Sequence, residues 1–317
     1  MFGRAPFILL LGFGVAWPLI SSCATGTDPW VAGARPAAMA ANLSSTPADS
    51  VVFSGAGDIA FEGPGAEQTA RILDGITGAV FTLGDNAYQS GSAEEFARFY
   101  HPTWGRHLSR TFPVVGNHEY RTPGASGYFA YFGPRAGDPG KGYYAFDLNP
   151  FWRVYSINSA DETDGASKQL GMGSEQYRWL AMELDTHRNK NTIAMWHHPR
   201  FSSGAHGDNP ETDAIWRLLV EKGVDIALWG HDHHYERFHP ADVSGREDEK
   251  KGLRSFVVGT GGKNHYPFFK LPKRITAVRN ARTFGVLKLT LHPTAYDWKF
   301  LPAAGGKFSD EGRSSVR

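Results

Sequence analysis

The sequence is poor in cysteine, since Cys23 is the only one among 317 residues. A single thiol excludes any disulfide within the chain. Long hydrophobic runs are also missing, because the N-terminal run from Phe7 to Ile20 holds fourteen residues and contains Pro18. A permanent membrane-spanning helix needs about 20 apolar residues. This run is therefore more typical of the apolar part of an export signal, with Arg4 as its positive charge.

The chain has no marked excess of one charge. Its 33 Lys and Arg residues and 32 Asp and Glu residues give a formal net charge of +1, so nucleic-acid binding has no global electrostatic support and is not expected. One local run is basic and contains no carboxylate, with Lys263, Lys270, Lys273, Arg274, Arg279 and Arg282. Most such runs are solvated surfaces, but beside a site this one would attract phosphate substrates.

The position of Cys23 carries a further signal, because it directly follows Ile-Ser-Ser. This "ISSC" stretch resembles the lipobox of bacterial lipoproteins, in which cleavage precedes the cysteine and lipid is attached to it. We predict a lipoprotein-type signal peptide at 1–22, lipidation of Cys23 and a flexible tether at 23–50. The alternative is an ordinary signal peptide that leaves a free thiol. We expect an exported protein that contacts membrane only through a lipid anchor at the bacterial cell envelope, or else is periplasmic or secreted.

After the tether, short apolar or β-branched runs alternate with segments of helical period, which predicts an α/β domain. We expect this domain at 51–303, followed by a tail at 304–317. A helix is expected at 174–187, and Ser92 and Glu95 have the spacing of a capping box. The predicted strands are 51–57, 79–85, 111–117, 153–158, 192–197, 224–230, 255–261, 285–291 and 295–301.

Side chains that bind metals well follow five of these runs, separated from the strand by at most a glycine. They are Asp58, Asp85, Asn117, His197 and His231. Each is a weak signal alone, because an Asp after a strand can simply cap the next turn. In open α/β sheets, however, sites assemble at the carboxyl ends of strands. Five such side chains at five strand ends therefore predict one shared site.

The sequence blocks around these residues carry a family resemblance. In order they are "GDIA" at 57–60, "GDNAY" at 84–88, "GNHE" at 116–119, "MWHHP" at 195–199 and "GHDHHYER" at 230–237. Together they resemble the calcineurin-like metallophosphoesterases, and Tyr88 narrows the resemblance to the purple acid phosphatase branch. The resemblance implies a four-layer α/β/β/α sandwich with two mixed β-sheets and a dinuclear metal site at the carboxyl edge of the strands.

The resemblance also implies a ligand set for two metal ions. Asp85 would bridge the ions, which suits a pair held about 3.5–4 Å apart. A phenolate with two carboxylates favours a trivalent ion, so Fe(III) is implied at the Tyr88 site and Fe(II), Zn(II) or Mn(II) at the second. One ion would bind Asp58, Asp85, Tyr88 and His233, and the other Asp85, Asn117, His197 and His231.

The block "GHDHHYER" contains three histidines, of which the family pattern uses two. In an extended segment, successive side chains point to opposite sides. We therefore expect His231 and His233 to face the site and His234 to point away.

The implied reaction is in-line attack on a phosphate monoester by a hydroxide that both metals activate. His118 would be the general acid or would stabilise the leaving group, although an orienting role behind a ligand is the alternative. His206, nine residues after His197, stands where the family has a substrate-contacting histidine. Its alternative is an exposed loop histidine without a role.

We therefore expect a phosphoric ester hydrolase of acid-phosphatase type with a phosphate ester substrate. One alternative is a phosphodiesterase acting on phospholipid or nucleotide diesters, because the same two-metal core serves both. The other is a surface protein that binds phosphate or a partner without catalysis. Two further hydrolase classes are excluded, because Thr122 replaces the second histidine of a zinc-protease HExxH motif and the chain has no GxSxG.

Overall fold

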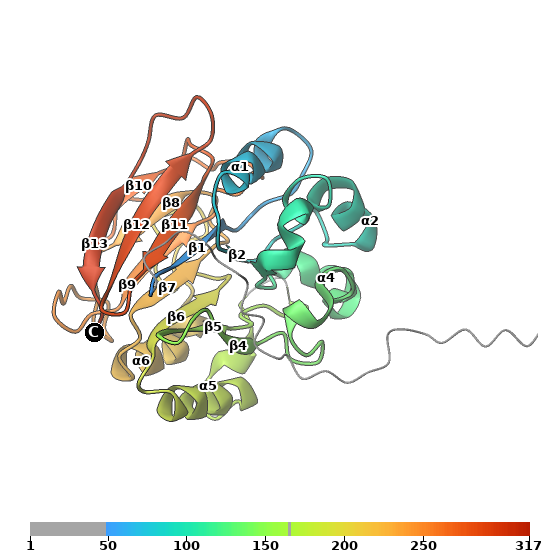
Figure 1. The fold of residues 1–317 in the computed structure, drawn as a ribbon. Coiled ribbons are helices and arrows are strands. Elements are labelled where there is room, and N and C mark those ends of the chain that lie inside the picture. Colours follow the sequence, from blue (N-terminus) through green and yellow to red (C-terminus); the bar gives the residue numbers. More distant parts are fainter. Residues whose placement is uncertain (1–48, 164–165) are drawn as a thin grey trace, which may run out of the picture. The chain divides into compact units, whose positions relative to one another are not determined.

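The computed structural model describes residues 49–163 and 166–317. The predicted signal peptide, Cys23 and most of the predicted tether lie outside the described residues. Within the described residues, no helix combines the length and the apolar character needed to cross a bilayer. Two β-sheets and the helices around them make up this part of the chain (Figure 1).

The six-stranded sheet has the order β13-β12-β11-β1-β2-β3. Its centre is parallel, since β2 pairs in parallel with both β1 and β3, whereas β11 pairs antiparallel with β1 and begins a meander through β12 to β13. The strands are β1 (Val51–Ala56), β2 (Ala79–Thr82), β3 (Thr111–Phe112), β11 (Gly285–Leu291), β12 (Ala295–Pro302) and β13 (Glu311–Ser315).

The seven-stranded sheet has the order β10-β8-β9-β7-β6-β5-β4. Strands β5, β6, β7 and β9 form a parallel centre, and antiparallel strands flank it on both sides. The strands are β4 (Tyr144–Asp147), β5 (Trp152–Ser156), β6 (Asn191–Trp196), β7 (Ile226–Trp229), β8 (Tyr235–Phe238), β9 (Arg254–Val258) and β10 (Thr276–Asn280).

Helices and short helical turns cover the sheets and connect their strands (Figure 1). The α-helices are α1 (Gly65–Asp74), α2 (Ala93–Glu95), α3 (Asn117–Tyr120), α4 (Ser126–Phe132), α5 (Glu175–Thr186) and α6 (Asp213–Glu221). The short turns are η1 (Phe96–Tyr100), η2 (Trp104–Arg110), η3 (Pro123–Ala125), η4 (Gly133–Ala136), η5 (Lys168–Leu170) and η6 (Pro210–Thr212). Helix α1 packs against β11 of the six-stranded sheet.

The layer order follows from side-chain alternation along the buried strands. In β6, Ile193 and Met195 join the main core with residues of both sheets, whereas Ala194 and Trp196 join a second cluster with residues of α5 and α6. One face of this sheet therefore packs on the other sheet, and its opposite face packs on helices. The predicted α/β/β/α arrangement with two mixed sheets is confirmed.

The predicted strands correspond to β1, β2, β3, β5, β6, β7, β9, β11 and β12. Strand β3 is shorter than predicted, because residues 113–116 leave the sheet before α3 begins. Helix α5 begins after Ser174, whose side chain accepts from the Tyr177 amide, and the capping box of Ser92 and Glu95 opens α2. The sequence did not indicate β4, β8, β10 or β13, and β13 lies within the predicted tail.

Candidate metal centre

The loops that follow the parallel strands are joined to one another by backbone hydrogen bonds. The Asp58 N–H donates to the Gly84 carbonyl at 3.1 Å, which links the ends of β1 and β2, and the Gly230 N–H donates to the His197 carbonyl at 3.1 Å, which links β7 and β6. Between the sheets, the His231 N–H donates to Asp58 Oδ2 at 2.9 Å. The polar strand ends of both sheets therefore meet at one edge.

The backbone at this edge is strained in a way that fixes the donor side chains. Asp58, Asp85 and His231 have positive φ angles of 60°, 51° and 69°, a conformation that costs non-glycine residues on the order of 1 kcal/mol or more.

Gly116 allows a close backbone approach, because a Cβ at this position would overlap the nitrogen and side chain of Asp85. The glycine of the "GNHE" block is therefore needed for the close approach of α3 to the β2 loop.

The first group of donors surrounds the phenol of Tyr88. The Tyr88 hydroxyl lies 2.9 Å from Asp58 Oδ1, 2.9 Å from Asp85 Oδ2 and 3.1 Å from His233 Nε2. His233 Nε2 is also 3.3 Å from Asp58 Oδ1. All four side chains are buried. These are the four predicted ligands of the first metal, and the fold brings their donor atoms together.

The second group of donors surrounds His197. Its Nε2 atom lies 3.0 Å from Asn117 Oδ1 and 3.3 Å from Asp85 Oδ1, and the His231 ring lies 5.0 Å from the His197 ring between centroids. Asp85 thus turns one oxygen to each group. Ligand atoms of Asp58, Asp85 and His197 all lie within 4.8 Å of one another.

Backbone carbonyl oxygens orient two of the imidazoles. His197 Nδ1 lies 2.7 Å from the Leu83 carbonyl oxygen, and His233 Nδ1 lies 2.8 Å from the Asn264 carbonyl oxygen. Each Nδ1 is therefore the protonated nitrogen that donates to the carbonyl, and each Nε2 is left to face the centre. This arrangement fixes the tautomer that a metal-binding histidine needs.

The charges of the centre are strongly coupled. Burial of the Asp85 carboxyl opposes its ionisation, but the imidazoles of His197 and His118 outweigh burial and hold the pKa of Asp85 well below its usual range. Burial likewise opposes charge on His197, and the carboxylates of Asp85 and Asp58 raise its pKa to about 9. At neutral pH, the negative charge of the Asp85 carboxylate is therefore balanced by the positive charge of the His197 imidazolium.

Two other predicted ligands, Tyr88 and His231, are neutral at the same pH. Burial, followed by the charges of Asp58 and Asp85, raises the pKa of Tyr88 well above its usual range. Burial, followed by three neighbouring histidines, lowers the pKa of His231 well below its usual range. A neutral imidazole is ready to bind a metal, whereas the phenol must lose its proton to do so. The donor set of carboxylates, phenol, amide and imidazoles thus fits metal ions, with proton release on binding.

Both predicted catalytic histidines lie beside this centre. His118 Nδ1 lies 2.7 Å from the Gln89 carbonyl oxygen, while its Nε2 is 3.8 Å from Asp85 Oδ2. The ring of His206 is 4.4 Å from the His231 ring between centroids, and His206 is exposed. His118 therefore stands over the two donor groups, and His206 stands at their rim.

His234 points away from both groups, but for a different reason than the sequence suggested. The segment from His231 to His234 is a series of bends with a left-handed residue at its start, and β8 begins only at Tyr235. The expected strand alternation is therefore wrong. Buried His234 instead lies against Glu236, with Nε2 and Oε2 3.0 Å apart.

Glu119 is a buried residue whose role the sequence did not reveal. Its carboxylate accepts from the backbone N–H groups of Asp85 at 3.0 Å, Asn86 at 2.7 Å, Ala87 at 3.3 Å and Gly116 at 2.8 Å. It therefore holds the β2 loop onto the start of α3. Burial and the charge of Asp85 raise the pKa of Glu119 to about 7. Its place three residues after Gly116, as in a capping box, is the signal that could have identified it.

The basic run noted in the sequence begins beside this centre. The Lys263 ammonium lies 2.9 Å from the centroid of the Phe61 ring and 5.0 Å from that of Tyr88. Tyr266 stacks on His233, with centroids 4.3 Å apart and an interplanar angle of 17°. Burial, followed by the charges of Asp58 and Asp85, raises the pKa of Tyr266 to about 12. No motif in the sequence indicated Tyr266.

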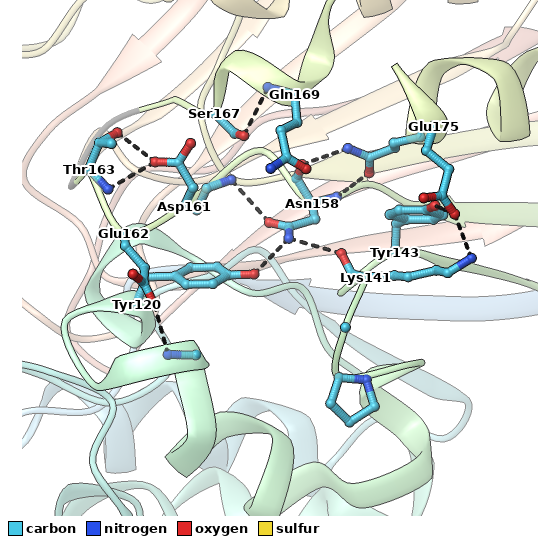
Figure 2. A pocket seen from close by; sticks show the side chains of 15 residues that line it. Tyr120, Lys141, Tyr143, Asn158, Asp161, Glu162, Thr163, Ser167, Gln169 and Glu175 are labelled. Atoms are coloured by element: carbon cyan, nitrogen blue, oxygen red, sulfur yellow. Dashed lines mark hydrogen bonds and ion pairs between the residues drawn. The ribbon is translucent and has the colours of Figure 1, made fainter. Parts of the chain in front are cut away.

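A separate cavity of about 420 Å³ lies beyond α3, and Figure 2 shows its lining. Asn158 crosses it, because its amide nitrogen donates to the Tyr120 hydroxyl at 2.7 Å and to the Lys141 carbonyl at 3.0 Å. At one side, Lys141 Nζ donates to Glu175 at 2.7 Å. None of the predicted metal ligands is among its described lining residues, so this cavity is not the metal centre.

Comparison with known proteins gives the centre a family context. Residues 56–235 match the calcineurin-like phosphoesterase family. The chain belongs to this family. The matched residues run from the end of β1 to the start of β8 and include the first four blocks and most of the fifth.

Curated relatives of the chain include acid phosphatases. Acid phosphatase type 7 of Mus musculus is 27% identical over 263 residues, which cover 70% of this chain and 58% of the relative. Its counterpart in Homo sapiens is 27% identical over 270 residues, which cover 74% of this chain and 60% of the relative. The chain thus spans 58–60% of the length of these relatives.

Solved structures share the fold. The purple acid phosphatase PPD1 from yellow lupin (Lupinus luteus) seeds superimposes with a TM-score of 0.66 and 18% identity, over 84% of this chain and 54% of that one. GAP50, the anchor in the inner membrane complex of Plasmodium, superimposes with a TM-score of 0.65 and 12% identity, over 85% of this chain and 90% of that one. The same fold is therefore found in a purple acid phosphatase and in an anchor protein.

Proposed function

We propose that this protein is a metal-dependent phosphomonoesterase of acid-phosphatase type. The observation that carries the proposal is the pair of donor groups that share Asp85, each completed by side chains from both sheets. Membership of the calcineurin-like phosphoesterase family and similarity to curated acid phosphatases support the reaction class.

The same geometry supports the assignment of ligands to two ions. Fe(III) at the first site and Fe(II), Zn(II) or Mn(II) at the second remain our proposal, because a phenolate beside carboxylates suits a trivalent ion. When bound, the ions would neutralise charge on the phosphoryl oxygens and lower the pKa of water. Asp58, Asp85, Tyr88 and His233 would hold one ion, and Asp85, Asn117, His197 and His231 would hold the other.

In this proposal, the proton for the leaving oxygen comes from His118. Its Nδ1–H donates to the Gln89 carbonyl, so Nε2 is the ring nitrogen available for proton transfer to the leaving oxygen. This Nε2 atom lies 3.8 Å from Asp85 Oδ2, so it faces the centre. His206 at the rim is positioned to contact the part of the ester that extends outward.

The replacement Asp85→Asn tests the proposal. Losing the shared carboxylate should lower metal content and reduce turnover of a phosphate monoester by more than about 100-fold, the upper range seen for groups that only support a ligand. Metal analysis, visible absorption for a tyrosinate-to-iron band, and turnover of a monoester and a diester are the measurements. Asp138→Asn, in an exposed loop, is the control.

Two outcomes would contradict the proposal. Full activity of Asp85→Asn would refute the bridging role. A folded, metal-loaded parent protein that hydrolyses neither ester would refute the enzymatic function, and faster turnover of the diester would replace the monoesterase with a phosphodiesterase.

We also propose that the protein is exported and held at the cell envelope through lipid on Cys23. The support is the "ISSC" stretch after the N-terminal apolar run.

A further inference from the structure

The loop between β9 and β10 carries two apolar side chains that point into solvent. Phe269 is 75% exposed and Leu271 is 87% exposed. Elsewhere in the described chain, the exposed large apolar side chains are Met172 and Met182, which are 81% and 60% exposed. Single exposed apolar residues are ordinary. Two in a stretch of three residues form a small apolar tip, which we call the 269–271 tip.

Contacts behind the tip hold it in this outward position. The Arg279 guanidinium lies 4.1 Å from the centroid of the Phe268 ring, which also lies 4.9 Å from the ring of His234. Arg279 Nη1 donates to the Lys270 carbonyl at 2.9 Å. Phe268 is thus fixed on the protein side, and the neighbouring side chains of the tip are directed outward.

The surroundings of the tip are positively charged. Lys270 and Arg274 are exposed, and the run from Lys263 to Arg282 contains no carboxylate. Two carboxylates from outside the run contact it, since Asp208 pairs with Lys273 at 2.8 Å and buried Glu236 accepts from the Thr276 hydroxyl at 2.6 Å. A second copy of this loop would be repelled by these charges. Anionic lipid headgroups would attract them, while the apolar tip enters the layer beneath the headgroups.

The tip belongs to the same loop as part of the metal centre. The Asn264 carbonyl orients His233, Tyr266 stacks on His233, and the ring centroids of Tyr266 and His206 are 5.8 Å apart. A surface that binds the tip therefore also faces the rim of the centre. We propose that the 269–271 tip docks the protein on an anionic lipid surface, with the candidate metal centre opening toward that surface.

The single cysteine of the chain makes a site-specific test possible. In the full chain carrying Cys23→Ser, Phe269→Cys provides one thiol for a dye whose emission depends on polarity. Vesicles of phosphatidylglycerol and phosphatidylcholine should shift the emission to shorter wavelength, and vesicles of phosphatidylcholine alone should shift it less. The matched control is Met182→Cys with the same dye, on α5, whose emission should not change.

The charge contribution is measured in the same labelled chain. Lys270→Gln with Arg274→Gln should weaken binding to the anionic vesicles by about 30-fold, because each basic side chain near an anionic surface adds to the attraction.

Phe269 and Leu271 have no part in the proposed chemistry, so Phe269→Asp with Leu271→Asp should keep turnover of a soluble ester and abolish the tip's contribution to vesicle binding.

The proposal is overturned if the label at 269 responds to anionic vesicles no more than the label at 182. It is equally overturned if the shift at 269 appears without vesicles as protein concentration rises, because the tip would then bind a second copy. If the N-terminal apolar run binds vesicles by itself, both labelled proteins bind equally. The difference between the labels at 269 and 182 then still reports contact of the tip with lipid.

Discussion

At the scale of single residues, His118 is the side chain whose chemistry can be separated from binding. General acid catalysis contributes about 10²–10⁴-fold, and mainly for leaving groups that need a proton. His118→Gln should therefore lower turnover of an alkyl phosphate about 100-fold or more, and that of 4-nitrophenyl phosphate less than about tenfold. Steady-state kinetics on both esters is the measurement.

The control for this variant is His239→Gln. His239 lies in another loop and, like His118, is partly exposed. It should change neither rate. Equal losses on both esters in His118→Gln would assign His118 to positioning rather than to proton transfer.

The sequence predicts those residues of the centre that directly follow strands, and it does not predict those that reach the centre from distant segments. The predicted ligands lie in short blocks at strand ends, four of which begin with glycine, so their convergence can be read from local pattern. Glu119 acts through four backbone N–H groups, and Tyr266 reaches His233 from a loop without a motif. Contacts of this kind depend on how distant segments meet, which local pattern does not encode.

At the scale of elements, Glu119 connects the β2 loop to α3. In Glu119→Gln, an amide NH₂ replaces one accepting oxygen and faces backbone N–H groups. The free energy of unfolding should fall by about 1–3 kcal/mol, and metal affinity should fall about 10–100-fold, because Asp85 loses its backbone support. Chemical denaturation and metal titration are the measurements.

The matched control for Glu119→Gln is Asp242→Asn, because Asp242 also accepts backbone N–H groups, from Ser244 and Arg246, in a turn outside the centre. This variant should lose stability and keep metal affinity. Unchanged metal affinity in Glu119→Gln would mean that Glu119 supports only the fold.

Asp225, just before β7, makes the pairing of β6 and β7 sensitive to pH. It accepts from the Thr192 N–H at 2.8 Å, and burial raises its pKa from 3.8 to about 6. The folded state therefore holds this proton more tightly than the unfolded chain. The stability from protonated Asp225 is complete below about pH 4 and is lost as the pH rises through about 6, by at most about 3 kcal/mol.

Asp225→Asn removes this titration and also alters the hydrogen bonds. Its absolute stability therefore matters less than the trend. Relative to the parent protein, its free energy of unfolding should increase between pH 4 and pH 7, as followed by denaturant titration at each pH. A flat difference for Asp225→Asn would show that Asp225 titrates alike in both states.

Element prediction succeeded where strands are buried and failed where they are polar. Strands β1, β6 and β7 are almost entirely buried and mostly apolar, and they were evident from composition. In β13, the residues Glu311–Ser315 alternate between exposed and half-buried positions, so only pairing with β12 makes this segment a strand. Such pairing joins a strand to the sheet edge through backbone groups, and side-chain pattern does not report it.

At the scale of the whole molecule, the proposed lipidation of Cys23 predicts how the protein is held at the membrane. If it is lipidated, the parent protein should remain in the membrane fraction after a high-salt wash, and Cys23→Ser should appear in the soluble fraction. Fractionation and the mass of the mature N-terminus are the measurements, with Ser45→Ala in the tether as the control. Retention of Cys23→Ser in the membrane would indicate an uncleaved apolar segment instead.

The donors of the centre come from both sheets, and this has a consequence for folding. Asp58 and His231 are 173 positions apart in the chain, and neither sheet alone contains a complete set of the predicted ligands. In the proposed metal centre, tight metal uptake would begin only after the two sheets have closed on each other, and bound metal would then oppose their separation. The rate of metal binding during refolding would therefore report the rate at which the two sheets assemble in the last folding step.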